Sequence, residues 1–207
     1  MRPRVGAVTR PEAVAVVREV QRHLRDVPHV QRRPQRASLG VSDNAQQPST
    51  DGLRIREAAR AIVLTPSHEV LLVRFEFPDG TRWALPGGGL EPGESAADAL
   101  RRELAEEAGL HDAAIGPHVW DRLHVIPFID GKWDGQREQI HLVRTEWFEP
   151  QPRLSWEELH RECLFEVRWW PVADIADGLP FVPRRLGALL RDLIADGPPN
   201  APVQVGV

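Results

Sequence analysis

Short runs of apolar residues, separated by turn-forming residues, fill the chain from about residue 56 onward. Runs of four to eight such residues bounded by Gly, Pro, Asp and Ser are typical of β-strands. Turn signals at Pro66–His68 and at Asp79-Gly80 separate the first three runs. The predicted strands are residues 59–64, 70–77, the segment leading to Pro86, 116–128, 139–148 and 165–170.

Two stretches have helical periodicity instead. In the first, Ser95 followed by Asp98 fits a capping box and Gly109 is suited to end the helix in the left-handed conformation. Apolar residues recur on one face of each helix, which can therefore pack on a sheet. They are Ala97, Leu100, Leu104 and Ala108 in the first helix, and Leu186, Leu189, Leu190, Leu193 and Ile194 in the second.

The ends of the chain differ from this central part. Residues 11–27 have helical spacing, and residues 28–49 are polar and rich in proline. We therefore predict an Arg-rich N-terminal extension over residues 1–53, made of a short helix and a linker, one domain over residues 54–197, and a tail over residues 198–207. The valines at positions 203, 205 and 207 alternate in the tail, which fits either an edge strand or a mobile end.

Composition and charge narrow the class of protein. The 42% apolar content is ordinary for a globular protein, and no apolar stretch approaches the length of a membrane span. Residues 1–50 carry nine arginines and four acids, so the total charge of −4 leaves −9 on residues 51–207. This acidic body argues against generic nucleic-acid binding. The single cysteine, Cys163, excludes an intrachain disulfide and fits a reducing compartment, so we expect a cytoplasmic protein.

The first helix carries three carboxylates within one and a half turns. Glu103 precedes Glu106 by three residues and Glu107 by four, and the last two are adjacent. We therefore expect the three carboxylates on one acidic face. Such a face is most often simply solvated, but like charges this close repel unless a cation lies among them. A loop of three glycines, residues 87–89, precedes the helix and can bring backbone close to a ligand. Mg²⁺ or Mn²⁺ is the natural candidate, because hard cations prefer carboxylate oxygens.

The whole segment resembles a known motif. Gly88 is followed after five residues by Glu94 and after seven more by Arg102-Glu103-Leu104-Ala105-Glu106-Glu107-Ala108-Gly109-Leu110. This spacing resembles the complete Nudix box, and every fixed position is filled. The resemblance implies a Nudix-type α/β/α sandwich with a mixed β-sheet. It also implies metal-dependent hydrolysis of a diphosphate bond, in a nucleoside diphosphate linked to another group or in a nucleoside triphosphate.

The resemblance assigns roles to individual residues. It implies Glu103 and Glu107 as the principal metal ligands, with Glu106 as a further ligand or general base and a backbone carbonyl at or next to Gly88. The arginine that matches Arg102 orients a catalytic glutamate in the family, although a simple surface pair with Glu106 is the plainer alternative. Many relatives use one more glutamate from a loop before the last strand. Here Glu157, Glu158 and Glu162 lie in that region, and we favour Glu162 because it is nearest to the strand. The alternative is that Glu162 is simply an exposed loop acid.

Recognition of the substrate is less specified by the sequence. Cations and aromatic residues near the box are candidates for phosphate contact or base stacking, although most strand tryptophans are core residues. From a set that also includes Phe75, Phe77, Trp120 and Trp133, the predicted substrate-binding residues are Arg56, Arg82, Trp83 and Arg137.

Two other functions compete with hydrolysis. One is a nucleotide-sensing Nudix module without turnover, but such a module has no need to keep the full acidic set. The other is an isomerase-type relative acting on isoprenoid diphosphates, which requires a catalytic cysteine in an early strand, whereas Cys163 lies far beyond the box. The expected partner is a small-molecule nucleotide, with no membrane and no specific nucleic acid, and the sequence is compatible with a homodimer.

Overall fold

The computed structural model describes residues 50–128 and 131–206. The helix predicted for residues 11–27 and the linker after it lie outside these described residues, as does Asp130 of the predicted turn region. No helix in the described part is long and apolar enough to cross a membrane.

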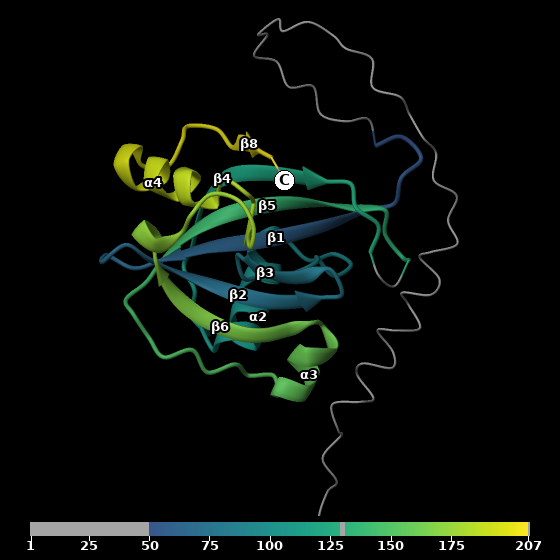
Figure 1. The fold of residues 1–207 in the computed structure, drawn as a ribbon, viewed down its shortest axis with the longest axis horizontal. Helices are drawn as coiled ribbons and strands as arrows, with labels where there is room; N and C mark the ends of the chain where they lie inside the picture. Colours follow the sequence, from purple (N-terminus) through teal and green to yellow (C-terminus); the bar gives the residue numbers. More distant parts are fainter. Residues whose placement is uncertain (1–49, 129–130, 207) are drawn as a thin grey trace, which may run out of the picture. The chain divides into compact units, whose positions relative to one another are not determined.

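The described residues form a mixed sheet with helices packed against it (Figure 1). Alternating and apolar runs supply the strands, because their branched and aromatic side chains fit a pleated, buried surface. The strands are β1 (Ile55–Leu64), β2 (Glu69–Phe77), β3 (Gly80–Ala84), β4 (Ile115–His124), β5 (Gly135–Arg144), β6 (Leu164–Pro171), β7 (Phe181–Val182) and β8 (Val203–Val205). The helices are α2 (Ala96–Ala108), α3 (Trp156–Arg161), α4 (Leu186–Asp196) and a 3-10 helix at Val172–Asp174.

The sheet has the strand order β7-β3-β2-β1-β5-β4-β8, and β6 pairs with β2 outside this path. Strands β1 and β5 are parallel along their whole length, from Ile55 opposite Gly135 to Leu64 opposite Arg144. Strand β2 pairs antiparallel with β3 and β6, and β4 pairs antiparallel with β5. The predicted mixed sheet of an α/β protein is therefore confirmed.

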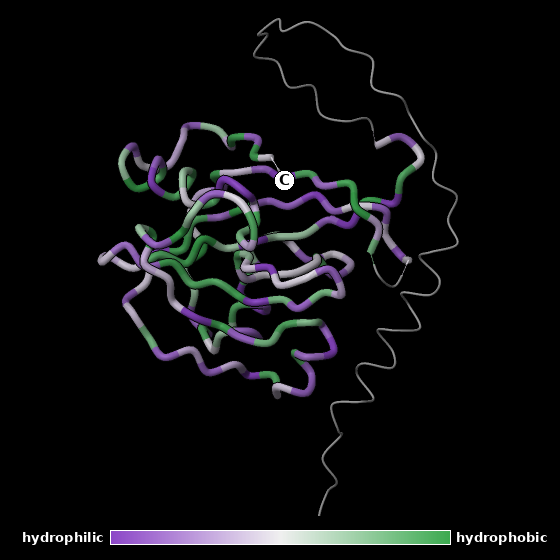
Figure 2. The backbone as a smooth tube through the Cα atoms, viewed as in Figure 1, coloured by the Kyte–Doolittle hydropathy of each residue, from purple (hydrophilic) through white to green (hydrophobic). Residues whose placement is uncertain are grey.

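Each face of the sheet is covered by a helix. On β1, Ile62 and Leu64 pack in the core that includes residues of α4, whereas Ala61 and Val63 pack in the core that includes residues of α2. Successive side chains of a strand point to opposite faces, so α2 and α4 lie on opposite sides of the sheet. In Figure 2, hydrophobic segments run along parts of the central strands, and hydrophilic segments occupy many of the connections.

Helix α2 begins and ends where the sequence predicts. The Ser95 side chain accepts a hydrogen bond from the backbone N–H of Asp98, which satisfies one of the free N–H groups of the first turn. Gly109 adopts the left-handed conformation after the last turn, and its N–H donates to the carbonyl of Ala105. The helix is therefore fixed at both ends by local chemistry.

Several other boundaries differ from the predictions. The two strands predicted at residues 116–128 and 139–148 lie at Ile115–His124 and Gly135–Arg144, because pairing with β1 starts at Gly135 rather than at the apolar run. Helix α3 was not predicted, although Ser155 and Glu158 form a capping box that could have indicated it. Val203 and Val205 of the tail lie in β8, which pairs with β4 at the edge of the sheet, and Val207 lies outside the described residues.

Candidate active site

The acidic residues of α2 divide between buried and exposed surroundings. Glu103 and Glu107 are 9% and 4% exposed, whereas Glu106 is only partly buried. The plain alternative of a solvated acidic face is therefore wrong for Glu103 and Glu107. Residues four apart on a helix share a face, and here that face lies against the glycine loop.

The glycine loop contacts both buried carboxylates. The N–H of Gly87 donates to Oε2 of Glu107 at 2.8 Å. A Cβ atom added at Gly88 would lie 2.1 Å from Oε1 of Glu103, so no other residue fits there unless Glu103 moves. Gly87 has a φ of 126°, which residues with a side chain rarely adopt. The positions of the glycine loop and of helix α2 are therefore coupled through these two contacts.

Arg102 holds the acids together from the other side. Its guanidinium donates to Glu94 at 2.9 Å and 3.0 Å, to Glu103 at 2.8 Å and to Glu106 at 3.4 Å. It also donates to the carbonyl of Gly89 at 3.1 Å. The planar guanidinium carries five donors, which explains why arginine suits this position. The alternative of a single surface pair between Arg102 and Glu106 thus describes only one of its contacts.

Burial shifts the ionisation of this group of residues. Burial is the main cause that raises the pKa of Glu107 to about 8, followed by the negative charge of Glu103, while the positive charge of Arg60 opposes the shift. Burial also raises the pKa of Glu103, although Arg102 acts against it. The hydrogen bond from Arg102 lowers the pKa of Glu94. Burial thus disfavours the charged form of both carboxylates.

The remaining acids of the predicted site lie around this pair. Glu106 forms an ion pair with Arg153, which the sequence did not predict. Glu162 ends helix α3, is exposed, and its charge contributes to the raised pKa of Glu107, so it lies within electrostatic reach. Within residues 50–128 and 131–206, no three His, Cys, Asp or Glu side chains are grouped so as to hold a metal ion. Arg102 still links two of the three α2 glutamates, because it donates to both Glu103 and Glu106.

The predicted substrate contacts are distributed over the sheet. Arg56 lies against Gly89 and donates to Gln136 at 3.2 Å, so it is beside the glycine loop. Arg82 pairs with Asp79, and Arg137 pairs with Glu57. The fourth candidate, Trp83, is 6% exposed and packs edge-on against Trp170 in the core, with the guanidinium of Arg168 over its ring.

The sequence predictions missed a buried ionic network behind the loop. Glu138 is bonded by Arg122 at 2.8 Å, by Gln136 at 2.7 Å and by Arg60 at 3.3 Å. Burial opposes ionisation of Glu138, but the charges of Arg122 and Arg60 lower its pKa to about 2. Arg60 also donates to the carbonyls of Leu85 and Gly87. A charged residue inside the apolar run of β1 was the signal that could have revealed this network.

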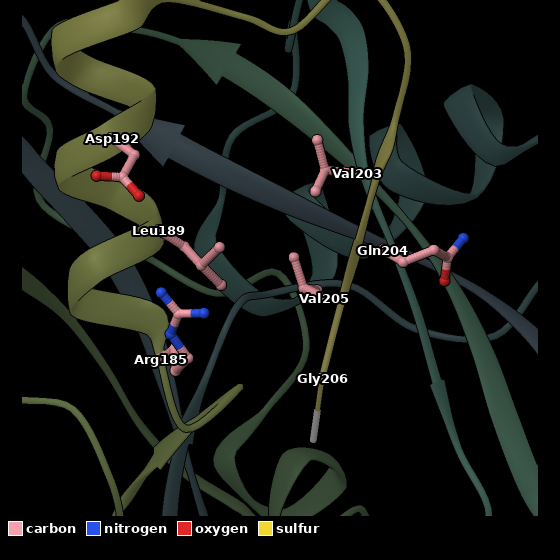
Figure 3. Close-up of a pocket in the computed structure, with 7 residues that line it drawn as sticks. All are labelled: Arg185, Leu189, Asp192, Val203, Gln204, Val205 and Gly206. Carbon is pink, nitrogen blue, oxygen red and sulfur yellow. The ribbon is translucent and has the colours of Figure 1, made fainter. Parts of the chain in front are cut away.

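One pocket of about 310 Å³ lies elsewhere, between α4 and β8 (Figure 3). Figure 3 shows Arg185 at the start of the helix, Asp192 on the helix, and Val203 and Val205 on the strand. None of the predicted site residues lines this pocket. It is therefore distinct from the acidic site of α2. The full set of lining residues is Arg185, Leu189, Asp192, Val203, Gln204, Val205 and Gly206.

Comparisons with known proteins agree with the motif. A family model described as the NUDIX domain matches residues 54–192. Nucleoside triphosphatase NudI of Enterobacter sp. (strain 638) is 43% identical over 65 residues, which are 30% of this chain and 43% of the relative. Human 8-oxo-dGDP phosphatase NUDT18 is 49% identical over 53 residues, which are 25% of this chain and 16% of the relative. The chain thus spans less than half the length of these two curated relatives.

Solved structures support the fold. The structure of the E. coli dihydroneopterin triphosphate pyrophosphohydrolase aligns with a TM-score of 0.52 and 15% identity, covering 70% of this chain and 98% of that one. At this level of identity the likeness concerns the arrangement of the elements alone.

Proposed function

Since this chain belongs to the NUDIX domain family, we propose that it is a metal-dependent hydrolase of a diphosphate bond. The substrate is a nucleoside diphosphate linked to another moiety, or a nucleoside triphosphate. The observation that carries the proposal is the pair of nearly buried carboxylates, Glu103 and Glu107, held against the glycine loop. The named activities of the curated relatives, a nucleoside triphosphatase and an 8-oxo-dGDP phosphatase, favour phosphorylated nucleosides as the substrate class.

The donor set fits a divalent cation. Burial raises the pKa values of both Glu103 and Glu107, and a cation beside them would favour their charged forms. Carboxylate oxygens suit Mg²⁺ and Mn²⁺, and we propose Glu103 and Glu107 as principal ligands, with Glu106 and the Gly88 carbonyl as further ones. When bound, such an ion neutralises phosphate oxygens and makes water more acidic.

The chain's own residues position the reaction. Arg102 orients Glu103 and Glu106 through direct hydrogen bonds, and Glu94 holds Arg102 through two more. Glu162 is the proposed general base, because it is exposed and lies within electrostatic reach of Glu107. Glu106 is the alternative base. Arg56 is the best placed of the proposed phosphate contacts, because it lies against the glycine loop. Arg82, Trp83 and Arg137 remain weaker proposals.

The finer assignments extend this proposal. We propose Mg²⁺ as the ion, a small-molecule nucleotide as the partner and the cytoplasm as the location, since a single cysteine suits a reducing compartment. The bounds of the extension, domain and tail, at residues 1–53, 54–197 and 198–207, also remain proposals.

A substrate panel tests the function. The full chain is incubated with Mg²⁺ and ADP-ribose, dinucleoside polyphosphates, nucleotide sugars, and ordinary and oxidised nucleoside triphosphates, and released phosphate is measured with and without a coupling phosphatase. Turnover of at least one substrate, abolished by EDTA and by Glu107→Gln, is the expected result. Absence of turnover throughout the panel, together with nucleotide binding that needs no metal, would instead identify a sensing module.

A further inference from the structure

Arg60 lies where the buried ionic network meets the glycine loop. Its side chain is 14% exposed, and its Nε donates to Oε1 of Glu138 at 3.3 Å. Its Nη1 donates to the carbonyls of Leu85, at 3.4 Å, and of Gly87. The guanidinium of Arg60 therefore joins strand β5 to residues 85–87, which lead into the proposed metal site.

The backbone of β1 fixes only part of that segment. The N–H of Ala61 donates to the carbonyl of Pro86, and the N–H of Ala59 donates to that of Gly88, both at 2.9 Å. Consecutive carbonyls of a paired segment point in alternate directions, so the N–H groups of a neighbouring strand can donate to only every second one. The intervening carbonyls, of Leu85 and Gly87, are the ones that Arg60 binds.

Fixing Gly87 has a consequence on the other side of the loop. The N–H of Gly87 donates to Glu107 at 2.8 Å, so a rotation of this residue would withdraw the donor from the carboxylate. The conformation of Gly87, with a φ of 126°, is available to glycine but is one of several that glycine can adopt. A contact to the Gly87 carbonyl selects among these conformations.

We infer that Arg60, oriented by Glu138, is a positioning residue that holds the glycine loop in the conformation needed by Glu107 and Glu103. Arg60 acts through the loop backbone and not by contact with substrate. Glu138 is suited to orient it because two further side chains, of Arg122 and Gln136, fix its carboxylate. This inference rests on the proposed function for the meaning of the loop, but its geometry can be tested without turnover.

The chain offers a matched control. Arg60 and Arg122 both pair with Glu138, and their side chains are similarly buried, at 14% and 9% exposure. Arg60→Met and Arg122→Met therefore each leave Glu138 with one arginine partner. Only the first removes donors from the Leu85 and Gly87 carbonyls. A third variant, Arg60→Lys, keeps a positive charge near Glu138 but lacks the planar group whose Nε bonds Glu138 while its Nη1 bonds the two carbonyls.

Two measurements on the full-length variants test the inference. Calorimetric titration with Mn²⁺ alone reports ion affinity, and amide hydrogen exchange of Gly87 in metal-free protein reports the loop. We expect Arg60→Met and Arg60→Lys to weaken Mn²⁺ binding by about 10-fold or more. Losses of this size are typical when a residue that orients a metal ligand is replaced. Both should also speed Gly87 exchange. Arg122→Met should change Mn²⁺ affinity by no more than about threefold.

Three results would contradict this role of Arg60. Equal losses in Arg60→Met and Arg122→Met would overturn the inference, because the effect would then come from the shared damage to Glu138. Full affinity in Arg60→Lys, or unchanged Gly87 exchange in Arg60→Met, would also overturn it. If the wild-type chain turns over no substrate, the proposed function fails, whereas the Mn²⁺ and exchange results still decide the role of Arg60.

Discussion

Replacing Glu107 by Gln should make the metal-free protein more stable at alkaline pH while removing its activity. Glu107 is 4% exposed, and its pKa is raised from 4.5 to about 8, mainly by burial. Between these two pH values the folded protein binds more protons than the unfolded chain, so the free energy of unfolding falls as the pH rises. Below pH 4.5 the carboxyl is protonated in both states and this penalty is absent. Above about pH 8 the full penalty is present.

The size of the effect follows from the shift. At about 1.4 kcal/mol for each pKa unit, the ionised Glu107 costs at most about 5 kcal/mol. Glutamine does not titrate, and its amide oxygen can still accept the hydrogen bond from Gly87. The stability gained by Glu107→Gln should therefore be near zero at pH 4 and rise to roughly 2 to 5 kcal/mol at pH 9.

Urea unfolding in EDTA, repeated from pH 4 to pH 9, measures this difference directly. The control is Glu149→Gln, which removes one charge from an exposed position. A variant that is equally or less stable than the wild type at pH 9 would refute the reasoning, because burial would then not be penalising the charge. Addition of Mg²⁺ should stabilise the wild type at pH 9 and have much less effect on Glu107→Gln, since the ion has lost a ligand.

Three further predictions concern the loop, the base and the extension. Gly88→Ala should reduce Mg²⁺-dependent activity by at least about 10-fold and lower the melting temperature, because the new Cβ would lie 2.1 Å from Glu103. The control is Gly206→Ala, where a Cβ meets no atom within 4 Å. Equal effects of the two substitutions would contradict the close contact at Gly88. Glu162→Gln should lower kcat about 100-fold with little change in KM if Glu162 is the base, and an unchanged kcat would shift that role to Glu106. Deletion of residues 1–50 should leave kcat and KM within about twofold of the full chain, and a loss of activity without unfolding would mean that the Arg-rich extension takes part in the site.

The sequence by itself determined those parts of the site that depend on interactions between residues close together in the chain. Ser95 and Gly109 mark the ends of α2 through hydrogen bonds to nearby backbone groups. The glycines before the helix and the acids within it have the spacing of the Nudix box, from which the family could be recognised. Most strands were also predicted, because alternation of apolar residues reflects the two faces of a sheet.

Only the tertiary structure decided which charges are buried and what they meet. Arg60 bonds to Glu138, 78 residues away in sequence, because β1 and β5 pair in parallel in one register. Glu107 is buried because the loop at Gly87 folds onto its face of α2, and Arg153 reaches Glu106 from 47 residues away. Periodicity shows which side of an element is apolar, but it carries no information about which distant element covers the polar side. The ionisation of these carboxylates depends on that covering, and so do the proposed metal site and its loop.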